Sequence, residues 1–215
     1  MYTFVSGWLV WIAFIVFFCG LIYRFVTLIR QAKKDKVIFP YMSLKYSLRS
    51  LLHWIIPFAS RNMRMRYETT VVTFAFHVCL VLLPIFLTAH VAMIAFSWGT
   101  SWPMLSEAAA DGLTIVVILA AVFFFVRRLM LPEVRFVTYP SDYFLLLVAA
   151  APFITGFIAH HQWFNYDAVI IIHMICGAAM LILIPFTRLS HMLFFPFTRA
   201  YMGCEFGAVR NAKDW

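Results

Sequence analysis

Two long stretches of this chain, residues 67–126 and 136–187, contain no lysine or arginine, although the 215-residue sequence holds 17 of them. The basic residues fall into three blocks, with ten in 24–66, three in 127–135 and four in 188–213. Lys and Arg collect on the cytoplasmic side of membrane proteins, and these blocks alternate with apolar segments as that rule requires. The net charge of +8 therefore reflects membrane topology and does not indicate a nucleic-acid partner.

The apolar segments between the basic blocks are long enough to cross a bilayer, which takes about 20 residues of helix. Hydrophobic residues make up 64% of the chain and charged residues 12%, which is typical of a polytopic membrane protein. We expect an all-α membrane protein, a single domain over 1–215 built as a five-transmembrane-helix bundle, with its N-terminus outside and its C-terminus inside. The predicted spans are 3–29, 68–97, 112–131, 142–163 and 167–195.

The segment 41–58 is too polar to span a membrane. Lys45, Arg49 and His53 recur at helical spacing, and leucines occupy the remaining surface. This pattern predicts an amphipathic helix that lies in the inner interface and ends near Pro57. The tail 196–215 is expected to be cytoplasmic.

Signals for the ends of the other helices are local. An acidic side chain can accept the unpaired backbone N–H groups at the start of a helix, so Asp111 and Asp167 are predicted N-caps of the third and fifth spans. Pro132 is expected to end the third span.

Two predicted spans each carry a pair of histidines, which are costly in lipid and mark functional sites. His173 and His191 are 18 residues apart, so on one continuous helix they would point to the same side, about 27 Å apart. His77 and His90 are 13 residues apart, about 220° around a straight helix, and Pro84 between them could change that phase by a kink.

The helical rise places these histidines at two levels. His90 and His173 would lie about 12 and 10 Å from the outer ends of their spans, and His77 and His191 about 15 and 12 Å from the inner ends. Two facing imidazoles at one level are what an iron porphyrin with two axial histidines requires. The alternative is four core histidines that form hydrogen bonds to neighbouring helices.

The run from His173 through Ile184-Pro185-Phe186-Thr187-Arg188-Leu189 to His191 resembles the last helix of the gamma (cytochrome b) subunit of respiratory nitrate reductase and its relatives. Phe76-His77 and the group Arg127-Arg128, Pro132, Val134 and Arg135 also resemble that family. The resemblance implies a five-helix subunit with two haem b groups. It implies that His77 and His191 hold the iron of the inner haem, and His90 and His173 that of the outer haem.

The resemblance further implies an electron-transfer subunit of a respiratory oxidoreductase complex in the bacterial or archaeal cytoplasmic (inner) membrane. The amphipathic segment 41–58 and the tail motif C-E-F-G-A-V-R are more similar to cytochrome b subunits in transmembrane complexes of sulfate reducers. That branch implies a heterodisulfide-reductase-like iron–sulfur subunit on the cytoplasmic side and a periplasmic multihaem cytochrome c outside, beside other membrane subunits. The nitrate reductase subunit has a lysine implicated at its quinol site, whereas 67–126 has none here, so a menaquinone or other quinone site stays an open alternative.

Other polar residues admit two interpretations each. His160 and His161, with Asn165, Asp167, Glu107 and Asp111 nearby in the loops, are either proton acceptors for quinol oxidation or solvated loop residues. No C-x-x-C or C-x-x-C-H motif is present, so neither an iron–sulfur site nor covalently attached haem is indicated, and no residue is assigned a catalytic role. The competing function is a haem-free membrane anchor or transporter subunit.

Overall fold

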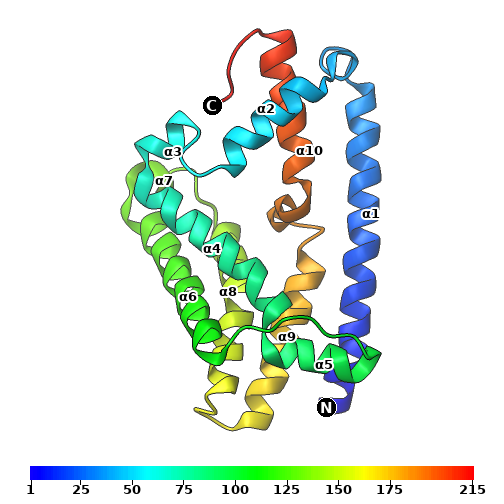
Figure 1. Ribbon diagram of the computed structural model, residues 1–215, viewed down its shortest axis with the longest axis vertical. Helices are drawn as coiled ribbons and strands as arrows, with labels where there is room; N and C mark the ends of the chain where they lie inside the picture. The colour runs from blue at the N-terminus through cyan, green and yellow to red at the C-terminus, as the bar shows by residue number, and fades with distance from the viewer. The chain divides into compact units, whose positions relative to one another are not determined.

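The computed structural model describes residues 1–215, and every regular element in it is a helix (Figure 1). Five helical segments are long and apolar enough to cross a membrane, which confirms the predicted all-helical fold with five candidate spans. They are Phe4–Lys34, Tyr67–Trp98, Glu107–Met130, Pro140–His160 and Tyr166–Leu183. Which side of the membrane each end faces stays a prediction.

The helices follow one another with short connections. They are α1 (Val10–Lys34, after a π-helical stretch Phe4–Leu9), α2 (Leu44–Ile55), α3 (Arg61–Met65), α4 (Tyr67–Phe86), α5 (Thr88–Trp98), α6 (Glu107–Met130), α7 (Pro132–Arg135), α8 (Pro140–His160), α9 (Tyr166–Leu183) and α10 (His191–Cys204, followed by a π-helical stretch Glu205–Val209). Short 3₁₀ turns cover Phe39–Tyr41 and Arg188–Ser190.

The contacts within the chain define two compact units. The first unit comprises residues 1–7 and 72–180, and the second comprises 8–71 and 181–215. That both belong to one membrane domain stays a prediction.

The core of the first unit lies among α4, α6 and α8, and α6 lies beside α8 (Figure 1). Small residues such as Ala120, Ala121 and Ala150 are buried there, so the helices approach closely. Large apolar side chains such as Phe96, Leu119 and Leu147 are exposed on the outside of the unit. Exposed apolar surface on long apolar helices is what a lipid environment requires.

The second unit is organised around the contact between α2 and α10 (Figure 1). Gly203 makes this close approach possible, because a Cβ there would lie 2.5 Å from the Cβ of Ser50. Three polar side chains, which we call the C-terminal clasp, connect the end of the chain to these helices: Ser50, Arg199 and Asp214. Asp214 accepts hydrogen bonds at 2.5 Å from both Ser50 and Arg199.

The helix starts differ from those predicted. Ser106 caps α6, accepting a hydrogen bond from the Ala109 N–H, so the prediction of Asp111 as cap is wrong and Asp111 lies inside the helix. Asn165 accepts from the Ala168 N–H at the start of α9, so the prediction of Asp167 is also wrong. In both cases a short uncharged side chain stands nearer the first turn and reaches the unpaired N–H groups first.

Two predicted spans are broken. The second ends as α4 at Phe86, and Leu87 has extended backbone (φ −65°, ψ 129°) before α5 turns away in a different direction (Figure 1). The kink considered at Pro84 is thus a full break three residues later. The depth counted back from Trp98 to His90 along one straight helix therefore does not apply.

The fifth predicted span, 167–195, is not one helix. α9 ends at Leu183, turns and a 3₁₀ segment follow, and α10 begins at His191. Pro185 lacks a backbone N–H and its ring clashes with the preceding turn, which ends the helix. The prediction that His173 and His191 share one face of a continuous helix is therefore wrong.

Other helix ends follow the prolines. α6 ends at Met130, just before Pro132, as predicted, and Pro132 begins the short helix α7. α2 ends at Ile55, whose next residue Ile56 is extended before Pro57. A helix therefore occupies most of 41–58, while its place in the membrane interface stays a prediction. The predicted tail 196–215 is helical as far as Val209.

Candidate functional site

His90 and His173 lie next to each other within the first unit. Their ring centres are 6.2 Å apart and the ring planes differ by only 19°. His90 comes from the first turn of α5 and His173 from the second turn of α9, so two separate helices supply the pair. Both side chains are half-buried.

Each of these rings is fixed by a hydrogen bond to a backbone carbonyl. Nδ1 of His90 donates to the carbonyl oxygen of Pro84 at 3.0 Å, and Nδ1 of His173 donates to that of Pro152 at 2.9 Å. A carbonyl can only accept, so Nδ1 carries a proton, and in the neutral form of the imidazole Nε2 is then the nitrogen with the lone pair. A histidine that donates its other ring N–H to a carbonyl is oriented as a metal ligand is.

Pro84 lies in the last turn of α4, where carbonyls lack a partner in the helix. The break at Leu87 frees this carbonyl and brings the His90 ring back onto it. The break at Leu87 therefore has two effects. It abolishes the angle between His77 and His90 that was predicted for one straight helix, and it orients the His90 ring.

α8 shapes the surroundings of His173. The hydroxyl oxygen of Thr155 lies 3.3 Å from its Nδ1. A Cβ on Gly156 would lie 2.9 Å from its Cε1, so only glycine leaves room for this ring. Pro152, Thr155 and Gly156 were not singled out from the sequence, although a proline and a glycine inside an apolar span are a signal that could have found them.

The separation of the two ring centres, 6.2 Å, matches what one metal ion between two imidazoles would give. For metal–nitrogen bonds of about 2.0 Å on each side, the ring centres would be roughly 6 Å apart. No hydrogen bond engages Nε2 of either ring. The donor set, two imidazoles in an apolar unit, fits the axial ligation of a haem iron.

His77 and His191 show the same backbone anchoring. Nδ1 of His77 donates to the carbonyl of Thr73 at 2.7 Å, and Nδ1 of His191 donates to that of Arg188 at 2.7 Å. The buried Phe76 packs edge-on against His77 with ring centres 5.4 Å apart. His77 belongs to the first unit and His191 to the second, and their pairing stays a prediction.

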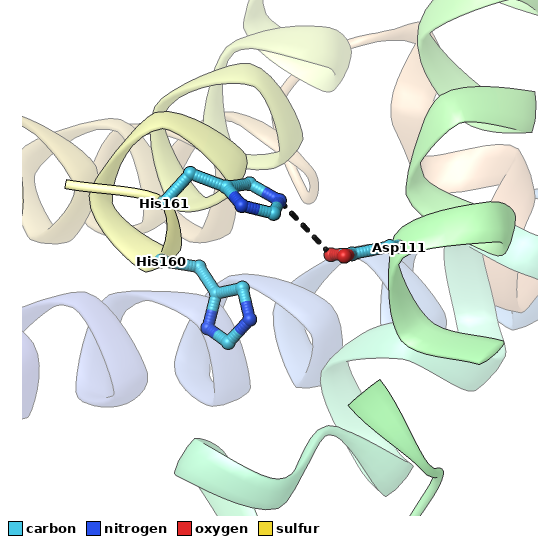
Figure 2. Close-up of side chains that lie close together, drawn as sticks. All are labelled: Asp111, His160 and His161. Atoms are coloured by element: carbon cyan, nitrogen blue, oxygen red, sulfur yellow. Dashed lines mark ion pairs between the residues drawn. The ribbon is translucent and has the colours of Figure 1, made fainter. Parts of the chain in front are cut away.

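A second group of side chains meets where α8 ends. Nε2 of His161 lies 3.3 Å from Oδ1 of Asp111, and His160 stands beside them (Figure 2). One ligand atom from each of these three residues lies within 4.8 Å of the others. Glu107 and Asp167 are not part of this group.

His53 has a different environment. Its Nδ1 donates to the carbonyl of Arg49 at 2.7 Å, and its ring stacks on Trp215 with centres 4.0 Å apart. It contributes to packing between α2 and the end of the chain.

The chain is similar over nearly all of its length to a protein of a known bacterium. No family model matches the chain. A protein of Nitratidesulfovibrio vulgaris strain Hildenborough, which carries only the name "Protein", is 37% identical over 216 residues. The alignment covers 98% of this chain and 96% of that protein.

Proposed function

We propose that this chain, which belongs to the family of the Nitratidesulfovibrio vulgaris protein, is a di-haem b membrane subunit of a respiratory redox complex. In this role it transfers electrons across a bacterial cytoplasmic membrane. The partners would be the quinone pool or a periplasmic multihaem cytochrome c on the outside, and a heterodisulfide-reductase-like iron–sulfur subunit on the cytoplasmic side.

The observation that carries the proposal is the pair His90 and His173. Two imidazoles 6.2 Å apart, in candidate membrane spans and both anchored through Nδ1, leave two Nε2 lone pairs in an apolar setting. Uncompensated polar atoms are expensive there, so a bound group that uses these lone pairs explains their retention.

Haem b held by two histidines would supply one-electron transfer and, with no open coordination position, would not bind oxygen. Neighbouring residues of the chain position the two imidazole rings. The carbonyls of Pro84 and Pro152 keep His90 and His173 in one tautomer. Gly156 provides the space in which the His173 ring sits.

The second haem is assigned to His77 and His191 from the resemblance. Its support in the structure is that each Nδ1 donates to a backbone carbonyl, as at the first pair. The ring of Phe76 packs edge-on against His77, and Phe124 packs edge-on against Phe76. These contacts restrict the rotation of the His77 side chain.

Support for the partners is less direct. The relative comes from a sulfate reducer, in keeping with the branch that the segment 41–58 and the tail motif resemble. Arg127 and Arg128 in the last turn of α6 and Arg135 in α7 would dock an acidic partner on the cytoplasmic side.

The test is a haem count on the purified full-length protein, with a dithionite-reduced spectrum. We expect two haem b per chain. Replacing His90 or His173 by Ala should remove one haem and spare the other, and His53→Ala, a matched histidine with the same carbonyl anchor, should keep both. A reduced spectrum without a b-type alpha band would favour the haem-free anchor or transporter, and two haems in His90→Ala would mean that this ligand is wrongly assigned.

The outer electron partner is a separate question with its own measurement. A quinol analogue and a reduced multihaem cytochrome c are each mixed with the oxidised protein, and haem reduction is followed. Reduction by the quinol analogue supports a quinone site, whereas reduction by the cytochrome alone supports a relay.

A further inference from the structure

We infer that Asp111, His160 and His161 form a binding site for a divalent transition-metal ion, with Zn²⁺ the best match to its ligands. The site lies at the end of the first unit where α6 begins and α8 ends (Figure 2). It is separate from the proposed haem ligands, so neither proposal depends on the other.

The spacing of the ligand atoms fits one small ion. Two atoms bound to a tetrahedral ion through bonds of about 2.0–2.1 Å lie about 3.3–3.4 Å apart. Nε2 of His161 and Oδ1 of Asp111 are 3.3 Å apart. The ligand atom of His160 lies within 4.8 Å of both, so a small rotation of this exposed side chain completes the set.

The His161 nitrogen that faces Asp111 has no other use in the structure. Nε2 is a buried atom without a hydrogen-bond partner, because its contact with Asp111 lacks hydrogen-bond geometry. Buried polar atoms are nearly always satisfied, so an unsatisfied one calls for an explanation. A metal ion between the two residues would use this nitrogen and the carboxylate together.

The backbone holds His161 firmly in place. Gln162 adopts a left-handed conformation (φ 52°), and the N–H groups of Gln162 and Trp163 donate to the carbonyls of Ala159 and Ile158. This is the double hydrogen-bond pattern that ends a helix with a left-handed residue. The ring of Phe157, 4.4 Å from that of His161 between centres, adds packing.

No Lys or Arg side chain of the first unit is available to neutralise Asp111. The only Lys or Arg residues in that unit are Arg127, Arg128 and Arg135. Arg127 lies 16 residues along the same helix, which is about 24 Å away at the helical rise. A cation from solution can reach the site, since the Asp111 and His161 side chains are each 31% exposed.

The ligand types select among metals. Two imidazoles and one carboxylate suit Zn²⁺ and similar transition metals, whereas Ca²⁺ and Mg²⁺ prefer oxygen ligands throughout. Three protein ligands leave a fourth position of the ion for water. Because the ligands come from α6 and α8, the ion would connect the ends of these two helices.

The experiment uses untagged full-length protein with its native bound groups, treated with a chelator and then titrated with Zn²⁺. Calorimetry and elemental analysis should give one Zn²⁺ per chain, and Zn X-ray absorption should show nitrogen and oxygen ligands with imidazole scattering. Loss of an outer-shell partner weakens metal sites 10–100-fold, so Asp111→Asn and His161→Ala should weaken Zn²⁺ binding at least about as much. The matched controls Asp167→Asn and His53→Ala should bind as the wild type does.

Two results would overturn the proposal: wild-type protein that binds no Zn²⁺ at micromolar concentration, or Asp111→Asn and His161→Ala variants that bind it as the controls do. Helicity by circular dichroism and the haem count, measured on every variant, separate loss of the site from misfolding. Wild-type protein with two haems and no Zn²⁺ would refute this site alone, and protein with Zn²⁺ and no haem would refute the proposed function alone.

Discussion

The two units use polar side chains in opposite ways. In the first, polar groups inside the apolar helices are histidines such as His90 and His173, whose only anchors are backbone carbonyls and, for His173, a threonine hydroxyl. In the second, Arg199 and Asp214 form a direct ion pair at 2.5 Å with side-chain exposures of 12% and 2%.

Because of this difference, we expect the polar side chains of the second unit to contribute to stability and the histidines of the first unit to bind a ligand. The clasp connects residues far apart in the sequence, Ser50 and Asp214 being 164 positions apart, so it holds the second unit together. The histidine pair of the first unit connects no charges and leaves Nε2 atoms available for a ligand. Substitutions in the second unit should therefore change stability first, and substitutions around His173 should change the bound group first.

The largest effect on the free energy of unfolding is expected at the C-terminal clasp. Asp214→Ala leaves the nearly buried Arg199 without its carboxylate, and breaking a buried pair costs about 3–5 kcal/mol. The lower end applies, because Nε of Arg199 and Oδ1 of Asp214 already lack hydrogen-bond partners. The loss of stability in Asp214→Ala is measured by thermal unfolding followed by circular dichroism.

The control for that substitution is Glu205→Ala. Glu205 pairs with Arg210 at 2.5 Å, but Arg210 is 61% exposed, so its loss should cost less than about 1 kcal/mol. Equal destabilisation by the two variants would contradict the assigned role of the clasp.

A smaller effect on stability, with a specific effect on the bound group, is expected in the first unit. Gly156→Ala places a Cβ 2.9 Å from Cε1 of His173, which must shift the ring, and such overpacking costs about 1–3 kcal/mol. We expect a displaced reduction potential or loss of one haem only, measured by redox titration. Gly177→Ala, with no atom within 4 Å of the added methyl group, should leave both haems unchanged.

The smallest effect is a pH dependence in the second unit. The Tyr201 hydroxyl donates to the Asp35 carboxylate, which lowers the pKa of Asp35 from 3.8 with help from the Val37 and Ile38 N–H groups. Desolvation and the nearby Asp35 raise the pKa of Tyr201 from 10.0 to about 12. The lowered pKa of Asp35 gives stability that is lost as pH falls below 3.8. The raised pKa of Tyr201 gives stability that is lost as pH rises from 10.0 toward about 12.

Tyr201→Phe removes both contributions. The melting temperature of the variant should be lower than that of the wild type by under about 3 °C between pH 5 and 9. The difference should shrink at both pH extremes. A difference that stays constant from pH 3 to 12 would show that the contact between Tyr201 and Asp35 contributes nothing through ionisation.

The success of the span predictions and the failure of some details have the same physical origin. Mean apolarity over about 20 residues decides whether a helix can span a membrane, and that quantity is local. The caps failed because Ser106 and Asn165 stand closer to the first turns than Asp111 and Asp167, which shifts α6 by five residues from its expected start at 112 to Glu107. The proline signals gave the positions of the breaks only approximately, since the chain left helical geometry at Leu87 and after Leu183.

The sequence by itself determined five apolar helices and the basic blocks between them. It also determined the four histidines in the predicted spans, which are costly in lipid and therefore indicate a function. Only the tertiary structure decided that His90 lies 6.2 Å from His173, that Asp111 faces His161 and that Asp214 reaches Arg199. The reason is that apolarity and helix formation depend on neighbours along the chain. Which side chains meet depends on where helices break and how they pack, and a break such as that at Leu87 redirects everything after it.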